Sequence, residues 1–252
     1  MNQALHFAVG LWFLSIGMLI PNFQISAGST SPKADAPASS NRAQLAATRV
    51  RPALDQELSR LGLRFGSPVF MRIFKQEQLL ELWVEGDSGK FILFRSYPIC
   101  AFSGEPGPKL RQGDKQAPEG FYRVGASQFN PNSQFHLAFD LGYPNAYDLA
   151  HGRTGNFLMV HGDCVSVGCY AMGDAGIEEI YTLAAAALEN AQQAFEVHAF
   201  PFRMDAERID AERNSPWFDF WMELKPAFDI FEQTHVPPAI GVRDRHYTTG
   251  GT

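Results

Sequence analysis

The spacing of apolar positions changes along the chain and separates strand-like from helix-like segments. Over 68–100, "PVFMRIFKQEQLLELWVEGDSGKFILFRSYPIC" contains three runs of alternating aromatic and β-branched residues, broken at "KQEQ" and "EGDSGK". Such runs predict three strands of an antiparallel meander. "FYRVGAS", "FHLAFDLG" and "AFEVHAFPF" predict further strands, and "NFLMV" predicts a short buried strand that leads into His161.

The period changes to that of a helix in three places. "ALDQELSRLGL" places three leucines on one face and predicts a short helix within 51–66. "DAGIEEIYTLAAAALENAQQ" predicts the clearest helix, over 174–193, with Asp174 as its N-cap. The tail, 204–252, contains "SPWFDFWMELKPAFDIFEQ", an aromatic-rich helical stretch that Pro226 is expected to interrupt. Its aromatic residues are expected to pack on the domain.

These segments predict a β-rich α+β domain over 67–203, with one long helix after a cysteine motif and a helical C-terminal extension over 204–252. The 252 residues, 45% hydrophobic and 13% aromatic, suffice for one buried core. The net charge of −6 argues against nucleic acid as a partner, because phosphate binding requires a basic surface.

The N-terminus predicts export. "LHFAVGLWFLSIGMLI", over 5–20, is an apolar run of signal-peptide length, and Ala27 is a small residue suited to a cleavage site. We therefore interpret 1–27 as a signal peptide. "MNQALH" carries no Lys or Arg, so a retained N-terminal membrane anchor is the alternative. The Ser-, Ala- and Pro-rich segment that follows predicts a flexible linker over 28–50.

The candidate chemistry lies in "MVHGDCVSVGCYAM", over 159–172. The chain has three cysteines, so one stays unpaired if the other two are bridged; a bridge between Cys100 and Cys164 would leave Cys169 as the thiol. The Cα separation that a disulfide requires does not follow from sequence, and the pairing stays open. The His and Cys spacing matches neither a paired CxxC nor an HExxH zinc motif, so we expect no metal and no cofactor.

The pattern around the unpaired cysteine indicates a nucleophile with its base. Gly162 follows His161, and Gly168 precedes Cys169, which gives a tight loop backbone freedom on both sides. The cysteine also comes shortly before the predicted helix, whose N-terminus favours a thiolate. A thiolate beside an imidazolium is what cysteine acyl transfer requires, and the amides of Gly168 and Cys169 are expected to form an oxyanion hole. The alternative to a catalytic pair is purely structural: a small buried cysteine that merely lies near a histidine of the core.

The motif "HGDCVSVGC" resembles the HG…SxGC signature of the YkuD-type L,D-transpeptidase family. "SGEPGPKLRQGDKQAPEGFYRV" looks like the family's Gly-Pro loop, and "FDLGYPNAYD" is similar to the segment before the catalytic strand in a Gram-negative subgroup. The resemblance covers about 67–202. It implies a YkuD-like mixed β-sandwich and an enzyme of the Gram-negative periplasm that acts on L,D bonds at diaminopimelate in peptidoglycan stem peptides.

By this resemblance Cys169 would be the nucleophile and His161 the general base. The Gly162 carbonyl would orient the imidazole, and Ser166 and Gly168 would shape the pocket and the oxyanion site. One position departs from the family pattern: the Arg that often follows the nucleophile is absent from "CYAM". Three cations are alternatives for its role, and spacing does not choose among them: Arg123, Lys109 and Arg111.

The departure leaves the fate of the acyl-enzyme open. The subgroup includes transpeptidases and a hydrolase that detaches an outer-membrane lipoprotein from peptidoglycan, so such a lipoprotein is an alternative partner. A catalytically inactive wall-binding module is the third reading. The residues considered for substrate binding are Tyr143, Asn145, Tyr170 and Arg123, with Asp140 as a further candidate for the cleft. Ordinary turn chemistry explains Asn145 and Asp140 around the proline equally well.

Overall fold

The computed structural model describes Met1 and residues 36–250. The predicted signal peptide beyond Met1 and the first part of the predicted linker, 28–35, lie outside the described residues. Among the helices of the described part, none is both long and apolar enough to cross a membrane.

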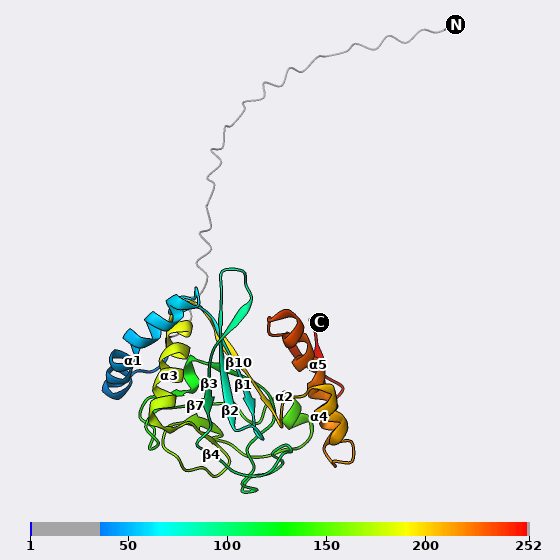
Figure 1. Cartoon of the computed structure of the whole chain (residues 1–252). Coiled ribbons are helices and arrows are strands. Elements are labelled where there is room, and N and C mark those ends of the chain that lie inside the picture. The colour runs from blue at the N-terminus through cyan, green and yellow to red at the C-terminus, as the bar shows by residue number, and fades with distance from the viewer. Residues whose placement is uncertain (2–35, 251–252) are drawn as a thin grey trace. The chain divides into compact units, whose positions relative to one another are not determined.

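A five-stranded sheet, here called the first sheet, forms the centre of the domain (Figure 1). Its order is β3-β2-β1-β10-β5, with β1 parallel to β10 and all other neighbours antiparallel. The strands are β1 (Val69–Phe74), β2 (Leu79–Glu85), β3 (Phe91–Pro98), β5 (Gly120–Gly125) and β10 (Ala194–Phe200). Every residue of β1 is buried, because both faces of the sheet are covered. The predicted meander of three strands is confirmed.

A second sheet has the order β4-β9-β8-β7-β6 and consists of short strands. They are β4 (Ala101–Phe102), β6 (Phe129–Asn130), β7 (Ala138–Asp140), β8 (Met159–His161) and β9 (Tyr170–Ala171). One hydrophobic core joins the inner faces of the two sheets, with Val197 and Tyr122 from the first and Val160 and Tyr170 from the second. The β-rich α+β class with a helical part is thereby confirmed.

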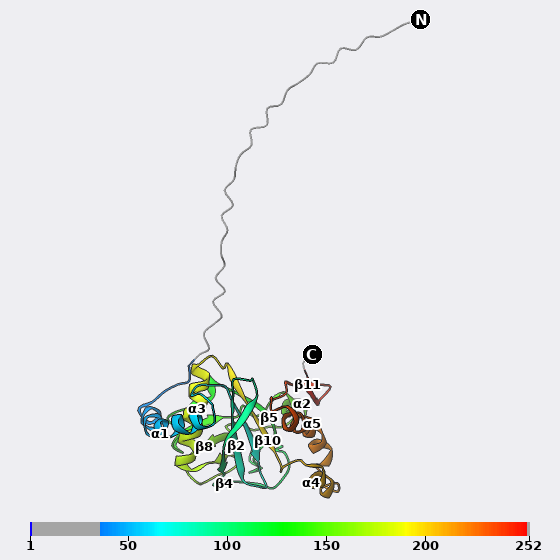
Figure 2. The same ribbon diagram turned by 45° about the horizontal axis from the view of Figure 1, so that its top comes forward.

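The helices α1 (Asn41–Arg60) and α3 (Gly173–Glu189) pack against each other beside the sheets (Figures 1 and 2). The predicted linker is wrong from Asn41 onward. Ser40 caps this helix by accepting the amide of Ala43, and the following Ala, Arg, Gln and Leu residues favour helix. Only Ala43 and Ala46 are buried in its first turns, and such small residues leave no apolar period in the sequence.

The predicted N-cap of the long helix is also corrected. α3 begins at Gly173, and Asp174 lies in its first turn, where its carboxylate accepts the amide of Asp163. The side chain therefore ties the helix to the segment after His161. There are two shorter helical segments. α2 (Ala146–Ala150) lies between β7 and β8 of the second sheet, and a 3-10 turn over Ala126–Gln128 leads from β5 of the first sheet to β6 of the second.

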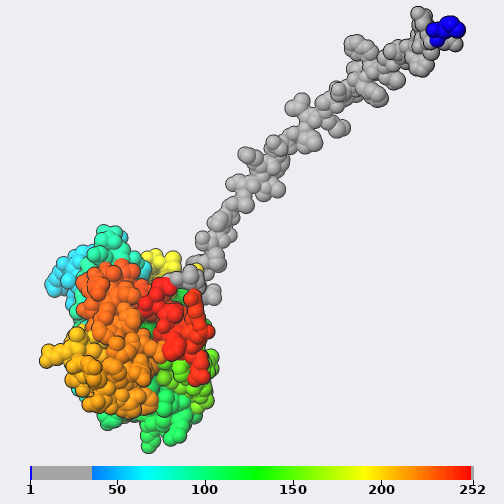
Figure 3. Space-filling model, turned by 90° about the vertical axis from the view of Figure 1, so that its right-hand side faces the viewer, coloured from blue at the N-terminus to red at the C-terminus, as the bar shows by residue number. Residues whose placement is uncertain are grey.

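The C-terminal extension covers the face of the first sheet opposite α3 (Figure 3). It comprises α4 (Ala206–Ala211), α5 (Phe218–Thr234) and a hairpin of β11 (Ile240–Arg243) and β12 (His246–Thr249). Phe228 packs against Phe74 and Phe200 of the sheet, and Trp221 packs against Phe202 just after β10, as expected for tail aromatics. α5 continues through Pro226, contrary to expectation, because buried residues on both sides of the proline anchor one continuous face. The hairpin was not predicted.

Candidate active site

The register of the second sheet places the candidate residues on one face. Ala138 of β7 lies opposite His161 of β8, and His161 lies opposite Ala171 of β9. Side chains alternate between faces along a strand, so Cys169, two positions before Ala171, projects on the same side as His161. The Cys169 Sγ lies 3.4 Å from the Met159 amide nitrogen of β8, which agrees with this alternation.

His161 is held in one tautomer. Its Nδ1 lies 2.5 Å from the carbonyl oxygen of Gly162, and a carbonyl only accepts, so Nδ1 carries the proton. In the neutral ring, Nε2 then has the lone pair that a base needs. The ring is buried and lies against Phe135, with 4.8 Å between centroids. A side chain at Gly162 would not fit, because its Cβ would lie 2.7 Å from an Asp174 carboxylate oxygen.

A bracing serine fixes the turn that presents Cys169. Ser166 Oγ accepts the Cys169 amide at 3.0 Å and donates to the Cys169 carbonyl at 2.7 Å. The Gly168 amide donates to Ser103 Oγ at 2.6 Å. Both amides expected in an oxyanion hole thus donate to serine hydroxyls in this structure, where Gly168 helps to hold the turn, and the oxyanion role of Gly168 stays a prediction. Ser103, which the sequence did not single out, is its partner.

The Cys169 thiol is half-buried, and its surroundings favour the protonated form. It donates to the Phe157 carbonyl at 3.6 Å, and burial raises its pKa more strongly than the Met159 amide and the charge of Lys109 lower it. Burial likewise lowers the pKa of His161. The two shifts favour a neutral thiol and a neutral imidazole over an ion pair.

The backbone amides at the start of α3 donate hydrogen bonds to carbonyls at and near His161. The Gly173 amide donates to the Asp163 carbonyl at 2.9 Å, and the Met172 amide donates to the His161 carbonyl at 2.8 Å. The expected stabilisation of a thiolate by this helix N-terminus is thus corrected: these amides anchor the segment that carries the imidazole.

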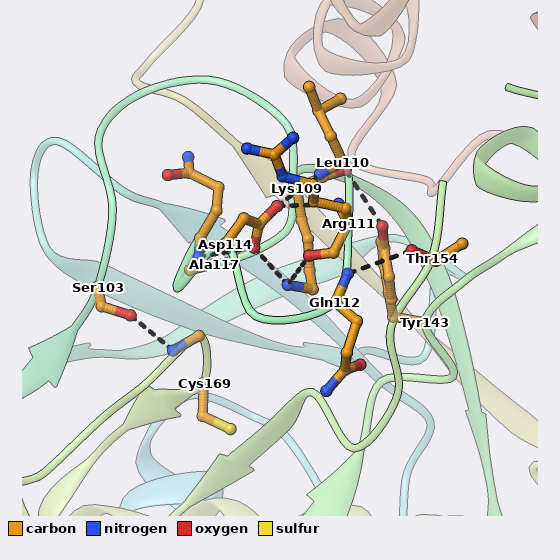
Figure 4. Close-up of polar contacts among 12 residues, drawn as sticks. Ser103, Lys109, Leu110, Arg111, Gln112, Asp114, Ala117, Tyr143, Thr154 and Cys169 are labelled. Atoms are coloured by element: carbon orange, nitrogen blue, oxygen red, sulfur yellow. Dashed lines mark hydrogen bonds and ion pairs between the residues drawn. The ribbon is translucent and has the colours of Figure 1, made fainter. Parts of the chain in front are cut away.

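A long loop over residues 103–117, here called the covering loop, lies over Cys169 (Figure 4). Within it, Lys109 Nζ bonds to Asp114 and to the Arg111 carbonyl, and the Asp114 carboxylate also accepts three backbone amides of the loop. Of the three cations considered as substitutes for the absent Arg, Lys109 is the one whose charge acts on the Cys169 thiol. It is 4% exposed, so the loop holds it in place.

The residues predicted for substrate binding mostly have structural roles. Tyr143 donates its hydroxyl to the Lys109 carbonyl at 3.1 Å and so supports the covering loop. Asn145 caps α2 through the Asp148 amide, and its Nδ2 donates to the Phe121 carbonyl and to Tyr247. The polar groups of these two residues therefore have partners within the fold, and their part in substrate binding stays a prediction.

The other two predicted contacts are corrected. Tyr170 faces the core, is fully buried, and donates its hydroxyl to the Pro118 carbonyl at 2.5 Å. Arg123 lies on β5 of the first sheet, opposite Glu196 of β10. Asp140, in contrast, lies on the same face as His161, and its charge raises the pKa of the Cys169 thiol.

A disulfide joins Cys100 to Cys164, with a Cα–Cα distance of 5.3 Å, and leaves Cys169 as a free thiol. It connects the end of β3 to the loop between His161 and Cys169. Within the described part of the chain, no cluster of three or more His, Cys, Asp or Glu side chains is arranged to hold a metal ion.

Known proteins resemble this chain in sequence. A family model of the L,D-transpeptidase catalytic domain, YkuD, matches residues 69–191. Two proteins of Escherichia coli, from strain K12 and from O157:H7, carry the description "Putative L,D-transpeptidase YafK". Each is 47% identical to this chain over 182 residues, which covers 72% of this chain and 74% of the relative.

Solved structures resemble it more distantly. The helical cell shape determining protein Pgp2 of Campylobacter jejuni, as its K307A mutant, is 23% identical with a TM-score of 0.45, over 69% of this chain and 63% of Pgp2. Bd1075 of Bdellovibrio bacteriovorus is 17% identical with a TM-score of 0.39, over 73% of this chain and 85% of Bd1075. It is the 47% identity to the two E. coli proteins, together with the family match, that shows that the chain belongs to the YkuD family of L,D-transpeptidase catalytic domains.

Proposed function

We propose that this protein is an exported cysteine acyl-transfer enzyme that acts on L,D bonds at diaminopimelate in peptidoglycan stem peptides. One observation carries the proposal: His161 and Cys169 project from one face of the second sheet, and the imidazole is fixed with Nε2 as the available base. Membership of the L,D-transpeptidase family supports the substrate class.

The chemistry begins from the neutral pair. Cys169 Sγ attacks the carbonyl carbon at the L-centre of diaminopimelate while its proton passes to His161 Nε2. The tetrahedral intermediate collapses, the C–N bond breaks, and the leaving amine takes the proton from His161. A thioester on Cys169 remains. A second amine, or water, then attacks the thioester with His161 again accepting the proton, and the thiol is released.

The structure suggests how the site compensates for the absent Arg. Lys109 is the nearby cation, and its charge opposes the effect of burial on the thiol. In the proposed mechanism it stabilises negative charge that develops on the sulfur and on the attacked carbonyl. Asp140 has the opposite effect on the thiol and favours the protonated resting state.

Purified protein and its Cys169→Ala variant incubated with muropeptides test the proposal. We expect the wild type to convert the muropeptides and the variant to be inactive. Mass spectrometry distinguishes a cross-linked dimer, which indicates transfer, from a shortened peptide or a released lipoprotein fragment, which indicates hydrolysis. Conversion that survives the substitution would overturn the assignment of Cys169. Sedimentation with peptidoglycan without any conversion would indicate a binding module.

A further inference from the structure

A buried ion pair of the first sheet lies outside the proposed chemistry. Lys75 and Glu119 are both 0% exposed, and Lys75 Nζ lies 3.0 Å from Glu119 Oε1. The other carboxylate oxygen, Oε2, accepts the indole N–H of Trp221 at 2.9 Å. Burying two charges is costly unless their hydrogen bonds are complete. Lys75, Glu119 and Trp221 are here called the buried triad. The hydrogen bonds of these three residues show which parts of the chain they hold together.

The ion pair fastens both ends of the covering loop. Lys75 Nζ lies 2.9 Å from the carbonyls of Glu105 and Gly107, near the start of the loop, and 3.1 Å from the carbonyl of Ala117, at its end. Glu119 Oε1 also accepts the Gly107 amide at 2.6 Å. Two backbone segments about ten residues apart are thus drawn to a single charged pair.

The same loop touches the turn that carries the thiol. Ser103, at its first position, accepts the Gly168 amide, and the Gln116 carbonyl lies 3.5 Å from where a Cβ of Gly168 would be. Lys109, at the middle of the loop, acts on Cys169 through its charge (Figure 4). The loop therefore contacts the turn that presents the thiol and contributes to the electrostatic surroundings of the thiol.

The C-terminal extension reaches the loop at two points. Trp221 of α5 bonds to Glu119, as described above. Trp217, the N-cap residue of α5, presses on Gly107: a Cβ at that position, with φ of +133°, would lie 2.4 Å from the indole nitrogen. No side chain other than the hydrogen of glycine fits beneath this indole.

We infer that Trp221 and Trp217 are positioning residues: through the Trp221–Glu119–Lys75 triad and the contact with Gly107, the C-terminal extension holds the covering loop over Cys169. The extension then helps to position the active site, although it covers the face of the first sheet that points away from the second sheet. The inference concerns the loop and the thiol alone, and its test uses no wall substrate, so its failure would leave the proposed function untouched.

The chain contains a matched control. Trp83 donates its indole N–H to buried Glu81 at 3.0 Å, and Glu81 pairs with buried Arg72 at 2.7 Å. Trp83 also contacts Phe231 near the far end of α5, with 4.9 Å between ring centroids. This second triad has the same chemistry and touches the same helix, but its bonds do not involve the covering loop.

The experiment compares Trp221→Phe with Trp83→Phe in the full chain, well below the melting temperature of both. We expect amide hydrogen exchange of Leu110 and Arg111 to be about tenfold faster or more in Trp221→Phe, because a buried hydrogen bond to a charged group is lost. The pH midpoint of Cys169 alkylation should fall in the same variant, since burial outweighs Lys109 in its effect on the thiol. Trp83→Phe should leave both quantities as in the wild type.

Equal exchange rates and equal midpoints in the two variants would overturn the inference, and so would changes that merely follow the loss of thermal stability. If Trp221→Phe does not fold, Trp217→Ala takes its place, because Trp217 is only partly buried. Its control is Phe218→Ala, a partly buried tail aromatic that packs on the sheet core. Faster exchange of the loop in Trp217→Ala alone supports the inference, and equal exchange in both contradicts it.

Discussion

His161 in the second sheet and His198 in the first sheet are both buried, and they differ in what their ring nitrogens contact. His161 Nδ1 bonds to the Gly162 carbonyl, which fixes the tautomer and leaves Nε2 on the face of Cys169. Both nitrogens of His198 lack a hydrogen-bond partner, and its ring lies between Phe70 and Phe121. Burial lowers the pKa of both, but only His161 has a geometry suited to proton transfer.

The contrast extends to the sheets themselves. The first sheet has long strands, and its central strand β1 is buried on both faces, so its side chains pack toward α3 on one side and the C-terminal extension on the other. The second sheet has strands of two or three residues, and one face carries polar groups. Packing in the first sheet stabilises the fold, whereas the polar face of the second carries the residues of the proposed chemistry.

Substitution of His161 should change activity more than any other change proposed below, and His198 supplies the comparison. His161→Gln removes the base and is expected to lower the rate of muropeptide conversion about 10²- to 10⁴-fold, with the melting temperature little changed. His198→Gln is the matched control and should leave the rate within a few-fold for the folded fraction. The measurements are product formation and thermal unfolding. Comparable rate losses in both variants would remove the distinction between the two sites.

The disulfide should contribute to the stability of the second sheet. Replacing Cys100 and Cys164 together by Ala opens a loop with a sequence separation of 64 residues, and we expect a loss of about 2–4 kcal/mol in the free energy of unfolding. Urea titration of the full chain measures it. Cys169→Ala is the control, since that cysteine is unpaired. A double variant as stable as the wild type would contradict the prediction.

Acid stability should depend on His198. Burial, and to a lesser extent the charge of Arg72, lower the pKa of His198 to about 3, and Glu196 Oε2 lies 4.0 Å from its Nε2. A histidine whose pKa is depressed on folding contributes stability that is complete above the unfolded pKa of about 6.5 and is lost as pH falls toward 3, by at most about 1.4 kcal/mol per pH unit.

His198→Leu should therefore weaken the decline of stability between pH 6.5 and pH 3 and be neutral or stabilising at pH 7, because an unpaired buried imidazole is removed. Urea unfolding at pH 7.0, 5.5 and 4.5 provides the comparison. A pH dependence identical to that of the wild type would show that His198 is not the group responsible.

The smallest effect concerns the resting state of the thiol. Because burial raises the pKa of Cys169, its alkylation by iodoacetamide should have a midpoint above the free-thiol value of about 8.5. Asp140→Asn should lower this midpoint, since the Asp140 charge favours the protonated form. A midpoint well below 8.5 in the wild type would instead indicate a preformed ion pair with His161.

Much of the fold was predictable from local pattern. The meander over 68–100 and the long helix near 174–193 have clear periods, because each buries one or both of its faces. The start of α1 and the C-terminal hairpin were missed, since α1 buries only alanines in its first turns and the hairpin strands have few buried residues. The candidate site residues from β8 to β9 were predictable because they all lie within fourteen consecutive residues, 159–172.

Local sequence was enough to predict which residue types act together. They are a histidine followed by glycine, and a cysteine preceded by serine and glycine, within one short segment. The tertiary structure decided which groups surround them. Ser103 accepts the Gly168 amide, and the charges of Lys109 and Asp140 act on the thiol, all from distant segments. Tyr170, next to Cys169, turns into the core because strand neighbours face opposite sides. The cation that we propose in place of the expected Arg comes from the covering loop, since burial and charge act through space and not along the chain.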